Sequence, residues 1–146
     1  MASSEGKRVV VVAVDDSEFA SKAFKFYVDD VKKDGDYVFL LHVPDSLDLS
    51  LGSPTTADKA LRELKANVEA IEKKYTQEME NHGCNGRFKT AHGKPGEVIC
   101  DIAKHEKAEL IVVGTRGLGV VRRTFLGSVS DYIVQHAHVP VLVCRH

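Results

Sequence analysis

The segment 110–130 carries the residues best suited to binding a phosphate group. Gly114, Gly117 and Gly119 follow a run of aliphatic residues and leave the next loop free of side chains, so that backbone N–H groups can approach a ligand closely. Gly127-Ser128 then begins a segment whose apolar residues recur at helical spacing. Because the start of a helix offers unpaired N–H groups and the positive end of the helix dipole, this pattern favours an anion. The residues alone leave a tight structural turn as an equally good alternative.

Side chains close to this segment could add charge or hydroxyl groups to such a site. Arg116, Arg122 and Arg123 could neutralise phosphate charge, although exposed loop arginines are more often only solvated. Ser128 and Ser130 place hydroxyl groups at the expected helix start, where they could contact a ligand, cap the helix, or do both.

Acidic residues follow the first apolar run of the chain. Asp15 and Asp16 could hold a magnesium ion or a ribose hydroxyl. The alternative is that they lie at the positive end of a helix dipole, beside Ser17 as the N-cap. His42 and the two aspartates are nearby candidates for a general base, but no motif places any of them in that role. We therefore assign no catalytic residue.

These residues must be positioned by elements that alternate along the chain between strand and helix patterns. We expect strands at 9–14, 37–43, 87–92 (at an edge), 110–113 and 139–144, and helices at 18–33, 57–82, 97–105 and after 127. The segment 44–56 shows no clear element, and we expect a mobile loop there. The alternation predicts a single α/β domain whose parallel sheet is covered on both faces. Ligands in such folds lie beyond the carboxyl ends of the strands, where the strand order reverses.

The expected helix 57–82 carries one continuous apolar stripe with a spacing of three or four residues. Its members are Leu61, Leu64, Val68, Ile71, Tyr75 and Met79. We expect this stripe to pack against the sheet rather than to form part of a binding site. Lysine and glutamate occupy the opposite face, as is typical of a solvated side.

Composition excludes several classes of protein. A chain of 146 residues with 43% hydrophobic residues is sufficient for one substantial core, and we expect one domain at 7–146 after a flexible tail at 1–6. The formal net charge of −1 argues against a polybasic surface for nucleic acid or membrane. No apolar run approaches the ~18 residues of a membrane span. The polar first residues and the three cysteines, which lack paired spacing, favour a cytoplasmic protein with reduced, mostly buried thiols.

The glycine spacing also carries a resemblance to a known family. The pattern G-x2-G-x9-G-[ST] is formed by Gly114, Gly117, Gly127 and Ser128. It resembles the ATP-binding signature of the universal stress protein family. The resemblance extends over essentially the whole chain, because the segments 12–18 and 139–143 are also similar to that family.

The resemblance implies a Rossmann-like fold with an open, twisted five-stranded parallel sheet in the order 3-2-1-4-5. It implies ATP, with Mg²⁺, as ligand, Asp15 as a residue that contacts the nucleotide or its metal ion, and the backbone of Val43 as the group that reads the adenine edge. The implied nucleotide-binding residues are Ala13, Val14, Asp15, Val43, Val113, Gly114, Arg116, Gly117, Gly119, Gly127, Ser128, Val129 and Ser130.

Members of the family pair through the last strand, so the resemblance also implies a homodimer formed through Val139–Cys144. The expected function is that of a nucleotide-dependent regulator or sensor in the stress response. Two alternatives stay open: a slow ATPase or autophosphorylating enzyme, and a dimeric interaction module that binds no nucleotide.

Overall fold

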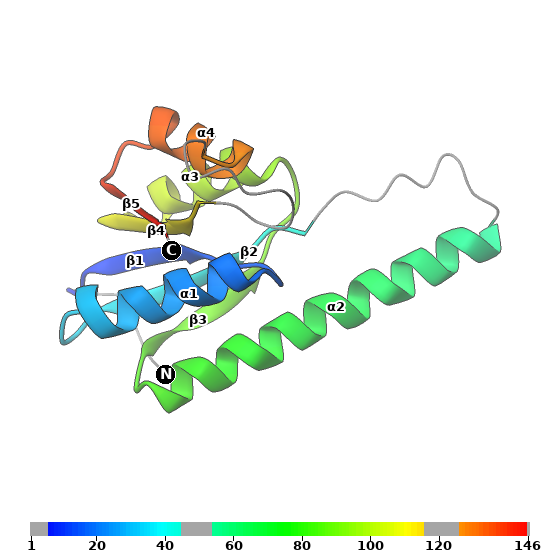
Figure 1. Ribbon diagram of the computed structural model, residues 1–146, viewed down its shortest axis with the longest axis horizontal. Coiled ribbons are helices and arrows are strands. Elements are labelled where there is room, and N and C mark those ends of the chain that lie inside the picture. Colours follow the sequence, from blue (N-terminus) through cyan, green and yellow to red (C-terminus); the bar gives the residue numbers. More distant parts are fainter. Residues whose placement is uncertain (1–5, 45–53, 116–125, 146) are drawn as a thin grey trace.

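The computed structural model describes residues 6–44, 54–115 and 126–145, apart from the side chain of Pro54. Its centre is a parallel five-stranded sheet in the order β3-β2-β1-β4-β5, which confirms the expected fold (Figure 1). The strands are β1 (Val9–Ala13), β2 (Tyr37–His42), β3 (Asn85–Thr90), β4 (Leu110–Gly114) and β5 (Val141–Cys144). The expected mobile loop at 44–56 falls mainly on residues outside these ranges.

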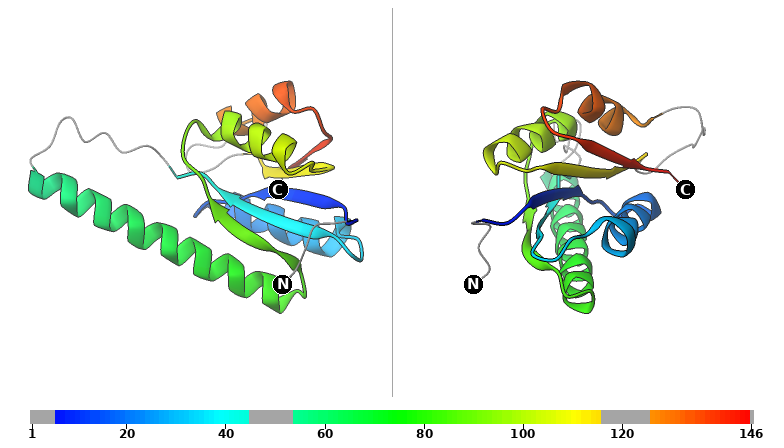
Figure 2. Two further views of the ribbon diagram at one scale, coloured as in Figure 1. Left: turned by 180° about the vertical axis from the view of Figure 1, so that it is seen from behind. Right: turned by 90° about the vertical axis from the view of Figure 1, so that its left-hand side faces the viewer.

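Helices cover both faces of the sheet. The helix α1 (Glu18–Phe26), its π-helical continuation η1 (Tyr27–Val31) and α2 (Pro54–Asn81) lie on one face, while α3 (Pro95–His105) and α4 (Ser128–His136) lie on the other (Figure 2). The crossover helices make parallel pairing of consecutive strands possible. Strands β1 and β4 are neighbours although most of the chain separates them, and the sheet order reverses between them.

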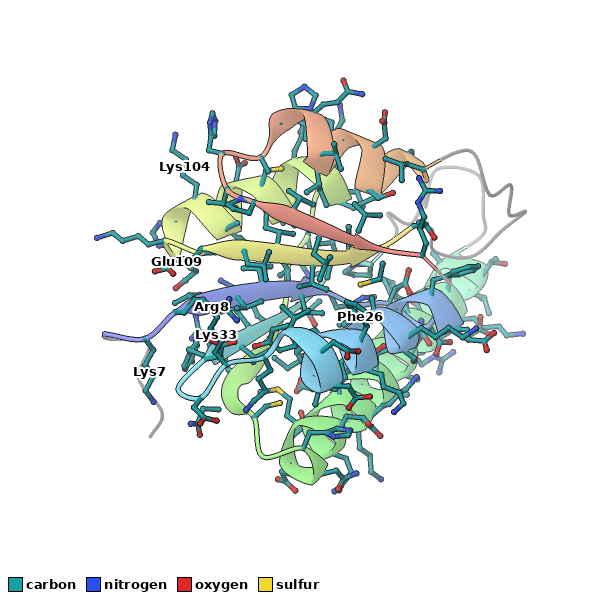
Figure 3. The ribbon with its side chains drawn as sticks, turned by 60° about the vertical axis from the view of Figure 1, so that its left-hand side comes forward. Lys7, Arg8, Phe26, Lys33, Lys104 and Glu109 are labelled. Carbon is teal, nitrogen blue, oxygen red and sulfur yellow. The ribbon has the colours of Figure 1, made fainter. Side chains whose placement is uncertain are left out.

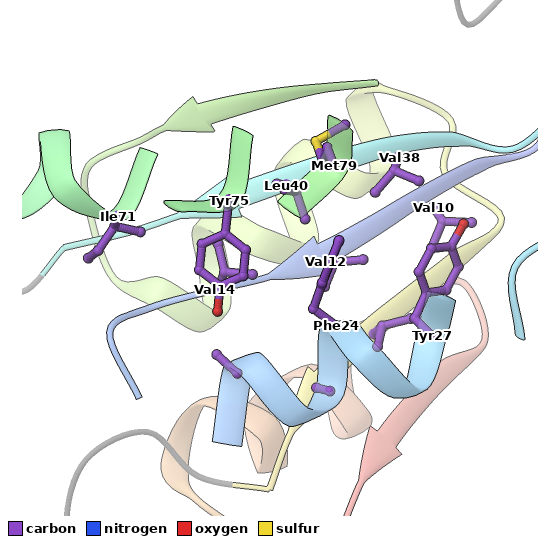
Figure 4. Close-up of a cluster of buried hydrophobic side chains, with 13 residues drawn as sticks. Val10, Val12, Val14, Phe24, Tyr27, Val38, Leu40, Ile71, Tyr75 and Met79 are labelled. Atoms are coloured by element: carbon purple, nitrogen blue, oxygen red, sulfur yellow. The ribbon is translucent and has the colours of Figure 1, made fainter. Parts of the chain in front are cut away.

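The two central strands are continuous apolar runs because both of their faces are buried. Residues of β1 alternate between two cores: Val10 and Val12 pack with α1 and α2, whereas Val9 and Val11 pack with α3 and α4. Figure 4 shows the first of these cores, where Phe24 and Tyr75 meet edge to face with ring centroids 5.8 Å apart. Alternate residues of the same strand thus contact the helices on the two faces of the sheet.

The expected helix at 18–33 changes type near its end. After Phe26 the backbone widens into a π-helix, in which the Lys32 N–H donates to the Tyr27 carbonyl. The buried Tyr27 side chain donates its hydroxyl hydrogen to Asp36 at 2.7 Å, and Arg8 donates to both oxygens of the same carboxylate. This network lies at the amino end of the sheet, where Arg8 and Lys33 are found (Figure 3).

The apolar stripe of α2 packs on the sheet only in its second half. Ile71, Tyr75 and Met79 are buried, but 46% of Leu61 is exposed, and the first half of the helix extends past the sheet (Figure 1). The expected packing role therefore applies to Ile71, Tyr75 and Met79 but not to Leu61. The helix begins at Pro54, where the fixed φ angle of proline suits a first helical turn.

Strand ends differ from the sequence expectation by one or two residues. Strand β3 is an edge strand, as predicted, but spans Asn85–Thr90. At the other edge, β5 begins at Val141, after Pro140, which has no N–H to give to a ladder. The three cysteines are free and half-buried.

Candidate functional site

One pocket of about 390 Å³ opens at the carboxyl ends of β1, β2 and β4. Every predicted site residue that the structure describes lines it: Ala13, Val14, Asp15, Val43, Val113, Gly114, Gly127, Ser128, Val129 and Ser130. The predicted residues Arg116, Gly117 and Gly119 lie outside the described residues, as do Arg122 and Arg123. Segments that are far apart in sequence therefore meet at the point where the strand order reverses.

Gly114, the last residue of β4, lies close to the backbone of Phe19. A Cβ atom added there would lie 3.0 Å from the carbonyl oxygen of Phe19, in the first turn of α1. The absence of a side chain at Gly114 thus allows α1 to approach the sheet. We expected this glycine to admit a ligand, and the structure supplies a packing reason in addition.

The start of α4 forms one wall of the pocket. Gly127 is its N-cap residue, with φ −66° and ψ 161°, a conformation open to any residue. Ser128 is exposed at the first helical position, whereas Ser130 is buried. The Ser130 hydroxyl donates to backbone carbonyls of Thr115 (2.9 Å) and Gly127 (3.1 Å). Ser130 therefore has a structural role, while Ser128 is exposed and lines the pocket at the helix start.

Asp15 and Ser17 organise the part of the pocket that follows β1. One carboxylate oxygen of Asp15 accepts the Ser17 N–H at 2.8 Å, and the Ser17 hydroxyl accepts the Ala20 N–H at 3.1 Å. The predicted N-cap is thus confirmed, and Asp15 takes part in it. Its second oxygen has no hydrogen-bond partner among the described residues, so Asp15 can cap the helix and still face a ligand.

Sequence reasoning missed the wall that α2 contributes. Leu64, Asn67 and Ile71 line the pocket together with Pro44 and Pro95. Two of the three α2 residues belong to the apolar stripe that we assigned to packing alone. The sequence signal that could have found them is the position of this helix, which follows directly on the segment leaving the carboxyl end of β2.

The electrostatics of the pocket are acidic on the side of β1. Asp15 and Asp16 line it, and no lysine or arginine does so within the part of the chain that the structure describes. No cluster of three metal-binding side chains is found among the same residues. A multiply charged anion here would need backbone N–H groups, a cation, or charges from outside the described ranges.

Comparison with known proteins settles the family. A sequence model of the universal stress protein family matches residues 7–145. The chain belongs to the universal stress protein family. A universal stress protein of Thermus aquaticus is 33% identical over 139 residues, which cover 94% of this chain and 98% of that protein.

Solved structures agree with this assignment. The universal stress protein UspA from Lactobacillus plantarum superposes with a TM-score of 0.79 at 27% identity, over 94% of this chain and 97% of that one. A universal stress protein family protein of Arabidopsis thaliana, solved with AMP bound, superposes with a TM-score of 0.72 at 25% identity, over 95% and 92% of the two chains.

No helix among the described residues of this universal stress protein is both long and apolar enough to cross a membrane.

Proposed function

We propose that this universal stress protein binds ATP, together with Mg²⁺, in the pocket at the carboxyl end of its sheet. Within this proposal it acts in the cytoplasm as a nucleotide-dependent regulator or sensor in the stress response. The observation that carries the proposal is the meeting of Asp15, Val43 and Gly127-Ser128 in a single pocket. Its volume of about 390 Å³ is within the usual range for small-molecule sites.

The start of α4 is suited to the phosphates. Its first N–H groups have no partner within the helix, and the helix dipole adds positive potential at this end. Gly127 and Ser128 present no bulky side chain there, so phosphate oxygens can come close to the backbone. Because the described pocket has no lysine or arginine, a magnesium ion held by the phosphates and Asp15 would supply the missing positive charge.

The other end of the pocket is suited to a purine base. Val43 and Pro44 follow β2, and Ile99 of α3 lies on the same lining, so this part offers apolar contacts beside a strand end with free backbone groups. The relative from Arabidopsis thaliana with bound AMP supports an adenine nucleotide as the class of ligand.

The proposal also includes a homodimer. Strand β5 pairs with β4 on one side only among the described residues, and its valines are half-buried. An apolar edge of this kind favours pairing with a second copy. Sedimentation at micromolar concentration should give a species of twice the chain mass of 16.1 kDa, and a monomer under these conditions would contradict the dimer.

The ligand can be identified without assuming which nucleotide binds, by analysing the small molecules that co-purify with the protein. Freshly purified protein is denatured, and any released small molecule is separated by chromatography and measured by its ultraviolet spectrum and mass. We expect an adenine nucleotide in a fixed ratio to protein. The nucleotide-free protein is then titrated with ATP, AMP and GTP, and equal affinity for GTP and ATP would contradict a site for adenine.

A further inference from the structure

The carbonyl group of Val14 is held by a side chain where a backbone N–H group would be expected. The Val14 N–H donates to the Leu41 carbonyl at 2.9 Å and so continues the parallel ladder between β1 and β2. In a parallel ladder, a residue whose N–H donates to the carbonyl of one residue on the neighbouring strand accepts, at its own carbonyl, the N–H of the residue two positions further along that strand. The Val14 carbonyl should therefore accept from the Val43 N–H.

The His42 imidazole occupies that place. Its Nδ1 atom lies 3.0 Å from the Val14 oxygen. A carbonyl oxygen can only accept, so the hydrogen must be on Nδ1 and the ring donates. No hydrogen bond of the Val43 N–H is found in the described part of the chain. The side chain of one residue has thus replaced the backbone donor of the next.

The choice of histidine at this position is not explained by packing. His42 is only 4% exposed and follows Val38 and Leu40 along β2, two aliphatic residues that pack with α1 and α2. The Nε2 atom of His42 is buried without a hydrogen-bond partner, a unique case among the described side chains. Since an aliphatic residue would avoid that unpaired atom, the bond from Nδ1 to Val14 is the feature that favours histidine.

The freed N–H group belongs to the pocket. Val43 is half-buried and lines it, and the next residue, Pro44, has no N–H with which to extend the ladder. Proline also restricts Val43 to extended backbone conformations. A single hydrogen-bond donor is thereby kept available at the carboxyl end of β2, on the side of β1.

We propose that His42 is a positioning residue, which holds the Val14 carbonyl so that the Val43 N–H stays free to donate to a ring nitrogen of the bound base. This inference rests on the proposed function, because the base is that of the proposed adenine nucleotide. His42 lines the pocket beside Val43, and in this proposal its role is exerted through the Val14 carbonyl rather than through a bond to the base. It acts by preventing a backbone hydrogen bond that would close this end of the pocket.

Three variants separate this role from a merely structural one. His42→Leu and His42→Gln remove a donor at the Nδ1 position, whereas the side-chain amide nitrogen of His42→Asn lies close to where Nδ1 was. Two measurements are made on each full-length protein: amide hydrogen exchange at Val43 without ligand, and calorimetric titration with ATP and Mg²⁺.

We expect the Val43 amide to exchange fast in the wild type and in His42→Asn. It should exchange slowly in His42→Leu and His42→Gln, because there the Val14 carbonyl is free to accept a hydrogen bond from the Val43 N–H. ATP should bind about tenfold more weakly to the two variants with a slow amide, which corresponds to the loss of one good hydrogen bond. Thermal unfolding shows whether each variant is folded, and His42→Gln replaces His42→Leu if the latter is not.

The exchange measurement keeps this inference separate from the proposed function. Equal Val43 exchange in all four folded proteins would overturn the role of His42, whatever binds in the pocket. Slow exchange in the Leu and Gln variants with unchanged ATP affinity would overturn the contact between Val43 and the base. A wild type that shows the expected exchange but binds no nucleotide would refute the proposed function, and with it a role of the free N–H toward adenine.

Discussion

The hydroxyl group of Ser130 donates to the backbone carbonyl of Thr115 across 2.9 Å. The same carbonyl also accepts the Gly127 N–H at 2.6 Å. Together these two bonds join the first turn of α4 to the residue that follows β4. The helix start that lines the pocket is therefore held by the sheet itself, and its N–H groups are oriented before any ligand arrives.

Exchanging each of the two serines for alanine should separate stability from binding. Ser130→Ala removes a buried hydrogen bond and leaves the fold less stable by about 1–2 kcal/mol, which chemical denaturation measures. Ser128→Ala changes an exposed hydroxyl without a structural partner among the described residues. It should leave the unfolding midpoint unchanged and weaken ATP binding severalfold. Equal loss of stability in the two variants would contradict the different roles that we assign to them.

Asp15 should show two functions that a pair of substitutions can separate. Asp15→Ala removes the acceptor of the Ser17 N–H and should destabilise the fold by about 1 kcal/mol, a typical loss for a helix N-terminal cap. Asp15→Asn keeps an oxygen for that bond and should unfold like the wild type. Both variants lack the negative charge, so both should lose most of the increase in ATP affinity that Mg²⁺ produces in the wild type. Calorimetry with Mg²⁺ and with a chelator gives this increase, and a full effect of Mg²⁺ in Asp15→Asn would exclude Asp15 from the metal site.

Acid should destabilise the fold through Asp36. Burial alone would raise the pKa of this carboxyl group, but hydrogen bonds from Arg8, the Lys33 N–H and Tyr27 outweigh it, so the pKa lies below the ordinary value of 3.8. A lowered pKa in the folded state means that the stabilisation is present above pH 3.8 and is lost as the pH falls through the lower, folded-state pKa.

Asp36→Asn tests that assignment directly. It leaves Arg8 without its ion-pair partner and should cost about 3 kcal/mol at neutral pH. The stability of the variant should then fall less between pH 4 and pH 2 than that of the wild type. Parallel curves of unfolding free energy against pH for the two proteins would show that other carboxyl groups cause the acid sensitivity.

Side-chain truncation should destabilise the fold to different extents in the two halves of α2. Tyr75→Ala removes a ring that is 1% exposed and should cost about 3–5 kcal/mol, as large aromatic truncations in a core do. Leu61 lies on the part of the helix beyond the sheet and is 46% exposed, so Leu61→Ala should change stability by less than about 0.5 kcal/mol. A large loss in Leu61→Ala would mean that this half of the helix is covered in solution.

The central strands could be anticipated because they depend on strong local signals. Runs such as 9–14 and 110–113 are typical of strands buried on both faces, and Asp15 and Gly114 each follow one of them. In a parallel sheet the residues after neighbouring strands must meet. The resemblance to universal stress proteins supplied the strand order, which periodicity alone does not determine.

Other features depend on contacts that no local pattern encodes. The closeness of Gly114 to Phe19 follows from how deeply α1 lies on the sheet. The exposure of Leu61 follows from α2 being longer than the strands beneath it. The replacement of the Val43 N–H by His42 at the Val14 carbonyl needs the register of β1 on β2. These are three-dimensional relationships between elements that are individually well predicted.

The central claim is that the start of α4 binds the phosphates of ATP, and calorimetric titration tests it most directly. MgATP is titrated into nucleotide-free wild type and into Gly127→Val, whose valine would occupy the space that a phosphate needs but fits the backbone conformation found at Gly127. Thermal unfolding confirms that the variant is folded. We predict binding in the micromolar range by the wild type and a loss of at least about tenfold, or 1.4 kcal/mol, in the variant. Absence of binding by folded wild type, or equal binding by the variant, would contradict the account.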